Sequence, residues 1–297
     1  MSIRSCLFLG LLAPIFACGL LLGQAARCTQ DSVVGSYAIA AQGNLLITPP
    51  GAAQPLPVPI ANLALVSIDS QGIMAGQGFG SLGGTVSQTP GTGSIHVNPD
   101  CTAVVTTAAG TKSIDLILDQ GQEIRGLMTQ ATGSKPVVQG TGRRICRFGR
   151  HPLFCDPRFQ TVFRQPQCSA ADVRGVYGVT YQGTYMVPQP GAPQPVPVPS
   201  LITALATIDY QGRLSGRGTI SMAGDAQDYP ILSGQIDIQP DCAATVQMSV
   251  SAGALTDEGK GWLVVLDGGN ELWGIQTESR VAKPILSGIW RRISPIP

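Results

Sequence analysis

The sequence predicts an all-β protein made of two tandem antiparallel up-and-down β-barrels of eight strands each. Three observations lead to this fold: a composition rich in turn residues, an internal repeat, and short segments in which apolar and polar residues alternate. The 297 residues include 37 glycines and 23 prolines, and 12% of them are charged, about half the share usual in globular domains. The net charge of +1 provides no long-range field that would attract nucleic acid or an anionic surface.

The N-terminal segment is typical of a signal peptide. Arg4 precedes an apolar run over residues 6–23, and small residues follow it. We expect cleavage after Ala25, so that residues 1–25 are removed and the mature protein is secreted or periplasmic, with no membrane association. The run is about long enough to span a bilayer, so an uncleaved anchor is the alternative. The run continues past Cys18, which argues against a lipoprotein modified at that residue.

The chain repeats itself. The segment "GSYAIAAQG" at residues 35–43 matches "GVYGVTYQG" at 175–183, and "LDQGQEI" at 118–124 matches "LDGGNEL" at 266–272. The offset grows from 140 to 148 residues in small steps, which indicates one fold with a few loop insertions. We therefore expect a barrel at residues 28–145, a linker at 146–167 and a second barrel at 168–297.

The cysteines follow the repeat. Removal of the signal peptide leaves six of them, an even number that implies disulfides in an oxidising compartment. They are Cys28, Cys101, Cys146, Cys155, Cys168 and Cys242. Cys28 precedes Cys101 by 73 residues and Cys168 precedes Cys242 by 74, so each repeat should bridge its first residues to its Pro-Asp-Cys segment, at about 4 kcal/mol for each bridge. Cys146 and Cys155 then pair with each other in the linker.

Alternation and turn residues place the strands. In "GQIDIQPD" the two isoleucines face one way and the polar residues between them face the other. Asp-x-Gln-Gly, Pro-Asp and Asp-x-Gly segments read as hairpin turns. For the second repeat we expect strands near 175–186, 198–209, 212–222, 233–239, 242–251, 260–267, 270–278 and 283–293. Eight short strands favour a closed barrel, and a two-sheet sandwich is the alternative because periodicity does not separate the two.

These segments carry a resemblance to known barrels. Gly35-x-Tyr37 on the first strand and Arg144 on the last resemble the Gly-x-Trp and closing arginine of calycin (lipocalin-like) barrels, with tyrosine here in the place of tryptophan. Tyr177 and Arg292 repeat the arrangement. The resemblance implies that Arg144 stacks on Tyr37, and Arg292 on Tyr177, to close one end of each barrel.

A closer resemblance is to secreted bacterial proteins of unknown function. Their V-x-P-D-C strand and late D-x-G-x-E-L…I-x-T strand stand here as "VNPDC" and "IQPDC", and as "LDQGQEIRGLMT" and "LDGGNELWGIQT". The resemblance covers most of both repeats. It implies a secreted barrel and no catalytic residues.

The residues themselves predict no catalytic, cofactor or metal site. His96 should be a surface residue, and His151 has no metal-ligand cluster near it in the sequence. The recurring acids Asp69, Asp209, Asp119 and Asp267 are explained by turns, in which an aspartate accepts hydrogen bonds from backbone amides. Glu123 and Glu271 also recur, but no partner for acid–base work can be placed beside them.

Three functions are compatible with these features. The first is an exported, non-enzymatic protein whose barrels bind a small apolar ligand or a surface partner, with Ile114 and Trp262 as candidates for the barrel interior. The second is a barrel-cavity enzyme of the cyclase or isomerase type, as in allene-oxide-cyclase-like barrels. The third is a structural or adhesive surface protein. No cofactor and no nucleic-acid partner are expected.

The proline-rich stretches and the linker are two further segments with a recognisable composition. The proline-rich stretches at residues 49–59 and 189–199 favour polyproline II and form either a passive connector or a lid or docking surface. The linker contains four phenylalanines, which should pack between the barrels because exposing them would forgo about 1.5–3 kcal/mol each. They are Phe148, Phe154, Phe159 and Phe163.

Overall fold

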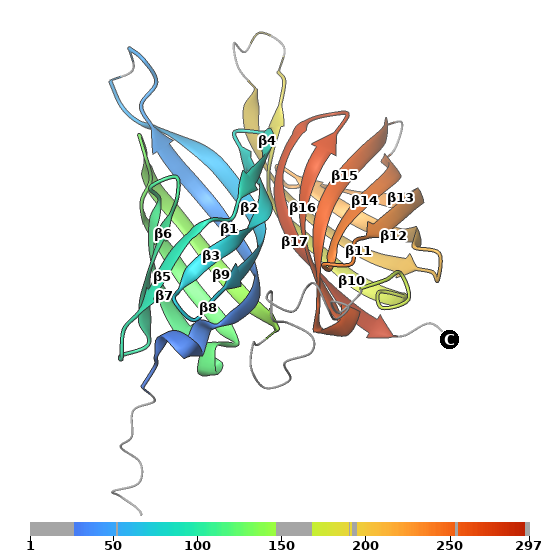
Figure 1. Cartoon of the computed structure of the whole chain (residues 1–297). Helices are drawn as coiled ribbons and strands as arrows, with labels where there is room; N and C mark the ends of the chain where they lie inside the picture. Colours follow the sequence, from blue (N-terminus) through green and yellow to red (C-terminus); the bar gives the residue numbers. More distant parts are fainter. Residues whose placement is uncertain are drawn as a thin grey trace, which may run out of the picture.

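Two closed antiparallel β-barrels lie side by side in the computed structural model (Figure 1). It describes residues 27–146 and 168–294, apart from positions 52, 190, 192–194, 253 and 254. The predicted pair of eight-stranded antiparallel barrels is therefore confirmed, and the sandwich alternative is wrong. The expected signal peptide, the Cys146–Cys155 bridge and the linker phenylalanines lie outside the described residues.

Barrel 1 closes through eight strands and carries a ninth. The strands are β1 (Gly35–Ile47), β2 (Leu56–Ile68), β3 (Ile73–Leu82), β4 (Thr85–Pro90), β5 (Gly93–Val97), β6 (Thr102–Thr107), β7 (Lys112–Leu118), β8 (Glu123–Gln130) and β9 (Lys135–Cys146). Their order is β2–β1–β9–β8–β7–β6–β5–β3, and pairing of β2 with β3 closes the ring. Strand β4 pairs with β3 as an extra strand.

Barrel 2 is a ring of eight sequential strands. They are β10 (Gly175–Val187), β11 (Val196–Ile208), β12 (Arg213–Met222), β13 (Asp225–Ile238), β14 (Ala243–Ala252), β15 (Leu255–Leu266), β16 (Glu271–Ser279) and β17 (Lys283–Ser294), and β17 pairs with β10. Two strands start earlier than predicted, β13 at Asp225 and β15 at Leu255. The two-residue turn after β12 leads directly into β13, and Pro230 stays in register with Arg217.

The turns use the expected residues. The Oδ1 atom of Asp69 accepts hydrogen bonds from the backbone amides of Gln71 (2.9 Å) and Ile73 (2.8 Å), and Asp209 does the same in barrel 2. Asp119 and Asp267 instead adopt a left-handed backbone within short 3₁₀ turns.

Each barrel has its own disulfide. Cys28 is bonded to Cys101 and Cys168 to Cys242. The second cysteine of each pair lies in the turn with a positive φ, 66° at Cys101 and 68° at Cys242, and the next strand starts one residue later. The expectation that these cysteines begin the strand is therefore wrong by one residue. Two disulfides indicate an oxidising environment.

A buried tyrosine and an arginine meet at one end of each barrel. The Tyr37 hydroxyl donates to the carbonyl of Gly121 (2.8 Å) and accepts from Nε of Arg144 (2.8 Å), whose guanidinium lies 5.3 Å from the ring centroid. In barrel 2 the Tyr177 hydroxyl lies 2.6 Å from the carbonyl of Gly269, and Arg292 lies 5.6 Å from the ring centroid. These contacts tie the first and last strands of each barrel to the 3₁₀ turn that precedes β8 or β16.

The last four residues of each proline-rich stretch, 56–59 and 196–199, form strand rather than polyproline II, and the described residues before them lie outside strands. Pro57 and Pro59 belong to β2 and pair with β1, while Pro197 and Pro199 belong to β11 and pair with β10. Pairing of β2 with β3 begins at Ile60, so the prolines occupy the edge of a hairpin that extends beyond the ring (Figure 1). An edge strand tolerates proline because no neighbour needs its missing N–H group.

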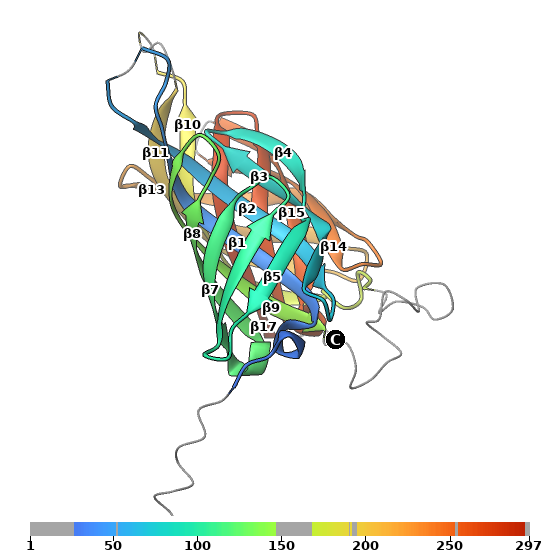
Figure 2. The same cartoon turned by 60° about the vertical axis from the view of Figure 1, so that its left-hand side comes forward.

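The barrels are joined by an apolar seam. It is formed by outward-facing side chains of β1, β2 and β3 on barrel 1 and of β15, β16 and β17 on barrel 2. Figure 2 shows barrel 1 turned forward over barrel 2. The buried members of the seam are Ala38, Ala61, Leu63, Ala243, Trp262, Val264, Leu266, Trp273, Ile275 and Ile285. The rings of Phe79 and Trp262 lie 5.4 Å apart across it.

A buried carboxylate adds polar contacts to the seam. Glu271 of barrel 2 accepts hydrogen bonds from Nη1 of Arg143 on barrel 1 (2.9 Å) and from Nε1 of Trp273 (2.6 Å). Its other oxygen lies 3.4 Å from Nε of Arg291. Because both oxygens have partners, the charge can be held in a largely buried position.

The prediction that Trp262 and Ile114 face the barrel interior is wrong. Trp262 lies in the seam, and Ile114 is 53% exposed on the outer wall of barrel 1. The neighbouring residues Leu263 and Val265 face the interior instead. Both faces of β15 are apolar because one lines the barrel and the other lines the seam, so alternation alone does not identify the inner face.

Removing the Trp262 ring should weaken the seam. Trp262→Ala should lower the free energy of unfolding of barrel 2 by about 3–5 kcal/mol, since a large aromatic side chain leaves a cavity in a packed region. Urea titration of the full chain measures this change. Tyr210→Ala, which removes an aromatic ring that is 66% exposed, should change it by about 0.5 kcal/mol or less. Equal effects of the two variants would contradict a packed seam.

Candidate functional site

The interior of barrel 2 holds a cavity of about 180 Å³. Its walls are mainly apolar and include Val179, Ile202, Ala204, Ile220, Met222, Ile231, Val246, Met248 and Val250. The lining also includes three tyrosines and one tryptophan, Tyr181, Tyr185, Tyr229 and Trp290, and polar residues such as Asp257, Lys260 and Gln276. An eight-stranded barrel is just wide enough to hold one small ligand when its side chains leave such a space.

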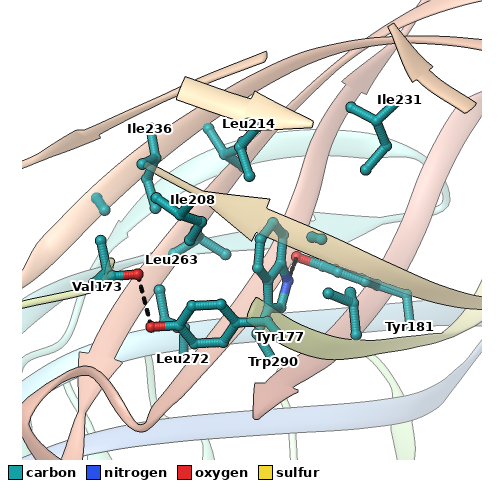
Figure 3. Packing of buried hydrophobic residues seen from close by; sticks show 14 of the residues in the cluster. Val173, Tyr177, Tyr181, Ile208, Leu214, Ile231, Ile236, Leu263, Leu272 and Trp290 are labelled. Carbon is teal, nitrogen blue, oxygen red and sulfur yellow. Dashed lines mark hydrogen bonds between the residues drawn. The ribbon is translucent and has the colours of Figure 1, made fainter. Parts of the chain in front are cut away.

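The aromatic side chains are held by hydrogen bonds to one another and to one amide. Figure 3 shows Tyr181 reaching toward Trp290, whose Nε1 donates to the Tyr181 hydroxyl (3.1 Å). The Tyr185 hydroxyl donates to Oε1 of Gln276 (2.8 Å). Tyr181 fits because β16 and β17 have glycines where it crosses them, and a Cβ atom on Gly274 or Gly288 would collide with its side chain.

The electrostatics of this cavity favour neutral ligands. Burial raises the pKa of Tyr229 to about 12 and raises the pKa values of Tyr181 and Tyr185 further, so all three phenols are neutral at physiological pH. The charged lining residues already have partners. The carboxylate of Asp257 accepts from Ser279 and from the amide of Arg280, and Lys260 pairs with Glu278 (2.8 Å). The arrangement can bind a small apolar molecule with a hydrogen-bonding group.

Barrel 1 encloses a second cavity, of about 200 Å³. Its lining differs at the positions that carry the large rings of barrel 2. Ala41 stands where barrel 2 has Tyr181, and Gly142 stands where it has Trp290. The two rings that fill part of barrel 2 therefore have no counterpart here, and Ala41, Gly140 and Gly142 line the cavity instead.

A buried carboxyl group faces the barrel 1 cavity. Asp115 is 9% exposed, and its Oδ1 atom is buried without a hydrogen-bond partner. Burial raises the pKa of Asp115, and a hydrogen bond from Ser113 opposes this shift only in part. Asp115 is the one ionisable residue among the described residues that line this cavity. A single carboxyl can bind a hydrogen-bond donor or a cation, but it provides only one member of an acid–base pair.

The residues singled out from the sequence lie elsewhere. Tyr37, Arg144, Tyr177 and Arg292 meet at the barrel ends, away from both cavity linings. His96 is exposed, as predicted. Glu123 pairs with Arg125 (2.5 Å) on the outer wall, and Glu271 belongs to the seam. Among the described residues, no three histidine, cysteine or acidic side chains are grouped as metal ligands.

Comparison of the two repeats could have found the missed cavity residues. Asp115 aligns with Leu263, and Asn62 aligns with Ile202, so polar residues occupy inward positions that are apolar in the other copy. Tyr181 aligns with Ala41. A polar residue in one repeat that aligns with an apolar inward residue in the other is the signal for a binding site.

No protein family matches the chain, and neither does any curated protein. Within the described ranges, no helix has the length and apolar character needed to cross a membrane.

Replacing Asp115 should stabilise barrel 1 at neutral pH. Because its folded-state pKa lies above the ordinary value of 3.8, the unfolded chain releases this proton first as the pH rises, and stability falls above that value. Asp115→Leu installs the barrel 2 residue and should raise the free energy of unfolding at pH 7 by about 1–3 kcal/mol, the cost of an unpartnered buried polar group.

Thermal unfolding at about pH 7 and at about pH 3.5 measures the gain, which should shrink at the lower pH because the carboxyl group is then protonated in both states. The reverse exchange, Leu263→Asp in barrel 2, should destabilise because Leu263 is fully buried. A destabilised Asp115→Leu variant at pH 7 would contradict a net cost of burying this carboxyl group.

Proposed function

We propose that the chain is an exported, non-enzymatic tandem barrel protein that binds a small, neutral, largely apolar ring compound inside barrel 2. The observation that carries the proposal is the cavity of about 180 Å³ lined by apolar side chains, three neutral tyrosines and Trp290. Cavities of about 150 Å³ in protein interiors bind benzene, so this space accommodates a single substituted ring.

Features of the lining support a ligand with one polar group. Tyr181, Tyr185 and Trp290 offer faces for ring contacts, and the Tyr185–Gln276 pair offers hydrogen-bonding groups close to the cavity. The resemblance of the Gly-x-Tyr and Arg segments to calycin barrels fits a carrier of small apolar ligands. Neutral phenols at physiological pH and a charged rim with its own partners favour binding over acid–base catalysis.

Two features support export. The two disulfides need an oxidising compartment to persist, and the N-terminal sequence has the charge and apolar run of a signal peptide. We therefore place the protein in the periplasm or outside the cell.

Titration with p-cresol tests the proposal. We expect saturable binding by isothermal titration calorimetry and a shift of the indole N–H resonance of Trp290, assigned by Trp290→Phe. Ala204→Phe should abolish this shift because Ala204 lines the barrel 2 cavity. Ala64→Phe makes the same change at the aligned position of barrel 1 and should preserve it. No saturable binding by the folded chain, or equal effects of the two substitutions, would overturn the proposal.

A further inference from the structure

The two barrels differ along one row of paired residues that crosses four strand boundaries. In barrel 2 the row is Leu263, Gly274, Gly288, Tyr181 and Ile202. In barrel 1 it is Asp115, Gly126, Gly140, Ala41 and Asn62. The two glycines are common to both rows, and in barrel 2 they leave room for the ring of Tyr181. In barrel 1 the Asp115 carboxylate lies over Gly126, and at Gly140 the methyl group of Ala41 stands in place of the tyrosine ring, so the cavity extends past Gly140 and Ala41.

Each end of the barrel 1 row has one buried acceptor atom that lacks a donor. The Oδ1 atoms of Asp115 and of Asn62 are both buried and accept no hydrogen bond in the described part of the chain. Leaving a buried acceptor unpaired costs about 1–3 kcal/mol, and more when the group is charged. Gly126 makes room for the carboxylate, since a Cβ atom at position 126 would collide with Oδ1 of Asp115.

We propose that barrel 1 binds a ring compound that carries a primary ammonium group, an arylalkylamine in chemical class. The ring occupies the space beside Gly140 and Ala41, where barrel 2 has a tyrosine ring. The ammonium group donates to Asp115, and Asn62 lies at the other end of the row, on the opposite wall of the cavity. This assignment goes beyond the proposed function, because it gives barrel 1 a cationic ligand and barrel 2 a neutral one.

The charges of the cavity select a cation. Asp115 is the one ionisable group among the described lining residues, so no lysine, arginine or histidine competes for it there. A carboxylate in an apolar space is stabilised strongly by an opposite charge that also donates hydrogen bonds. A carboxylate or phosphate ligand would place a second negative charge beside the first, at a cost that the cavity does not offset.

Calorimetric titration with 2-phenylethylamine and with its neutral analogue 2-phenylethanol tests this site. Asp115→Asn should weaken binding of the amine by about tenfold or more, the equivalent of 1.4 kcal/mol, and should change binding of the alcohol by about twofold or less. Ala41→Tyr should abolish binding of both, because it restores the ring of barrel 2. In the wild type, amine affinity should fall at low pH as Asp115 becomes protonated.

The barrel 2 variant separates the two sites. Ala204→Phe should leave amine binding intact while it blocks p-cresol. Loss of amine binding in Ala204→Phe would place the amine in barrel 2 and overturn this inference while leaving the proposed function standing. Equal affinities for amine and alcohol, unaffected by Asp115→Asn, would also overturn it, and failure of p-cresol binding alone would overturn only the proposed function.

A second inference rests on the outer walls of the barrels. Barrel 2 packs into the seam with residues of β15, β16 and β17, and barrel 1 carries apolar residues at the aligned positions of β7, β8 and β9. The aligned pairs, barrel 1 residue first, are Ile114 with Trp262, Leu116 with Val264, Leu118 with Leu266, Leu127 with Ile275, and Val137 with Ile285. In barrel 2 all five are buried, and in barrel 1 all five are exposed, Val137 by 60%.

The opposite wall of barrel 2 shows the complementary feature. Barrel 1 enters the seam with β1, β2 and β3, and the aligned strands of barrel 2 are β10, β11 and β12. Ala61 and Leu65 of the seam align with Leu201 and Leu205, which are 49% and 40% exposed. Each chain thus presents both halves of its internal seam, one half on each barrel.

We infer that a second copy of the chain docks on these walls, with the β7–β9 wall of one copy against the β10–β12 wall of the next. The aligned positions also repeat the charges of the seam, since Glu123 and Arg291 align with Glu271 and Arg143. Within one chain Glu123 contacts Arg125 and Arg291 contacts Glu271, so docking of a second copy extends these ion pairs. Arg125 stands in place of Trp273 and Thr219 in place of Phe79, so the contact between copies is weaker than the seam. The contact joins two different walls, so it builds either closed rings or filaments.

Complementing variants test this arrangement by sedimentation velocity over a concentration series. The wild type should show a rising average mass. Ile114→Asp and Leu201→Asp should each be monomeric, because each places a charge on one of the two walls. An equimolar mixture of the two variants should form a dimer and nothing larger, since each partner keeps one intact wall. Self-association of Leu201→Asp alone would show a two-fold contact between β7–β9 walls and overturn the inference, and so would a wild type that stays monomeric.

Discussion

The fixed width of an eight-stranded barrel is the constraint on which the rest of this structure depends. Strand number sets the interior volume, so the size of each inward side chain decides whether the barrel is filled or hollow. Barrel 2 fills much of its interior with Tyr181 and Trp290 and retains a cavity of about 180 Å³. Barrel 1 has Ala41 and Gly142 at these positions and encloses about 200 Å³ with Asp115 facing it. The same backbone therefore supports two interiors of different chemistry.

The side chains on the outer walls depend on what covers them, as the inward side chains depend on the barrel width. A large apolar patch on an outer strand wall is rare on a monomer and marks a surface that a partner covers. The β15–β17 wall meets this condition through the seam, where Trp262 packs on Phe79 and Glu271 pairs with Arg143. The aligned wall of barrel 1 keeps the apolar residues without the cover, and it lacks both tryptophans. The β15–β17 wall has the larger apolar side chains, which suit the permanent contact of the seam. The β7–β9 wall has smaller ones, which suit a reversible contact.

Much of the fold followed from the sequence because repeat offsets and period-two alternation are direct consequences of strand geometry. The barrel fold was predicted, as were the turns at Asp69 and Asp209 and the disulfide between Cys28 and Cys101. Alternation gave no orientation for Trp262, because β15 is apolar on both faces and nothing local distinguishes a seam from an interior. The cavity residues were missed for another reason. Asp115 reads as an ordinary polar residue in its own strand, and only its alignment with Leu263 marks it as an inward carboxyl group.

The disulfides explain how each barrel tolerates a hollow interior. An unfilled cavity costs about 24 cal/mol per Å³, so the space of about 180 Å³ in barrel 2 lowers its stability by about 4 kcal/mol. A bridge that closes a loop of 74 residues, as between Cys168 and Cys242, restores about 4 kcal/mol by restricting the unfolded chain. Cys28 and Cys101 close a loop of nearly the same length around the cavity of barrel 1. In each barrel the disulfide thus offsets the cost of the cavity. The interior residues of one barrel can therefore change without lowering the stability of the other.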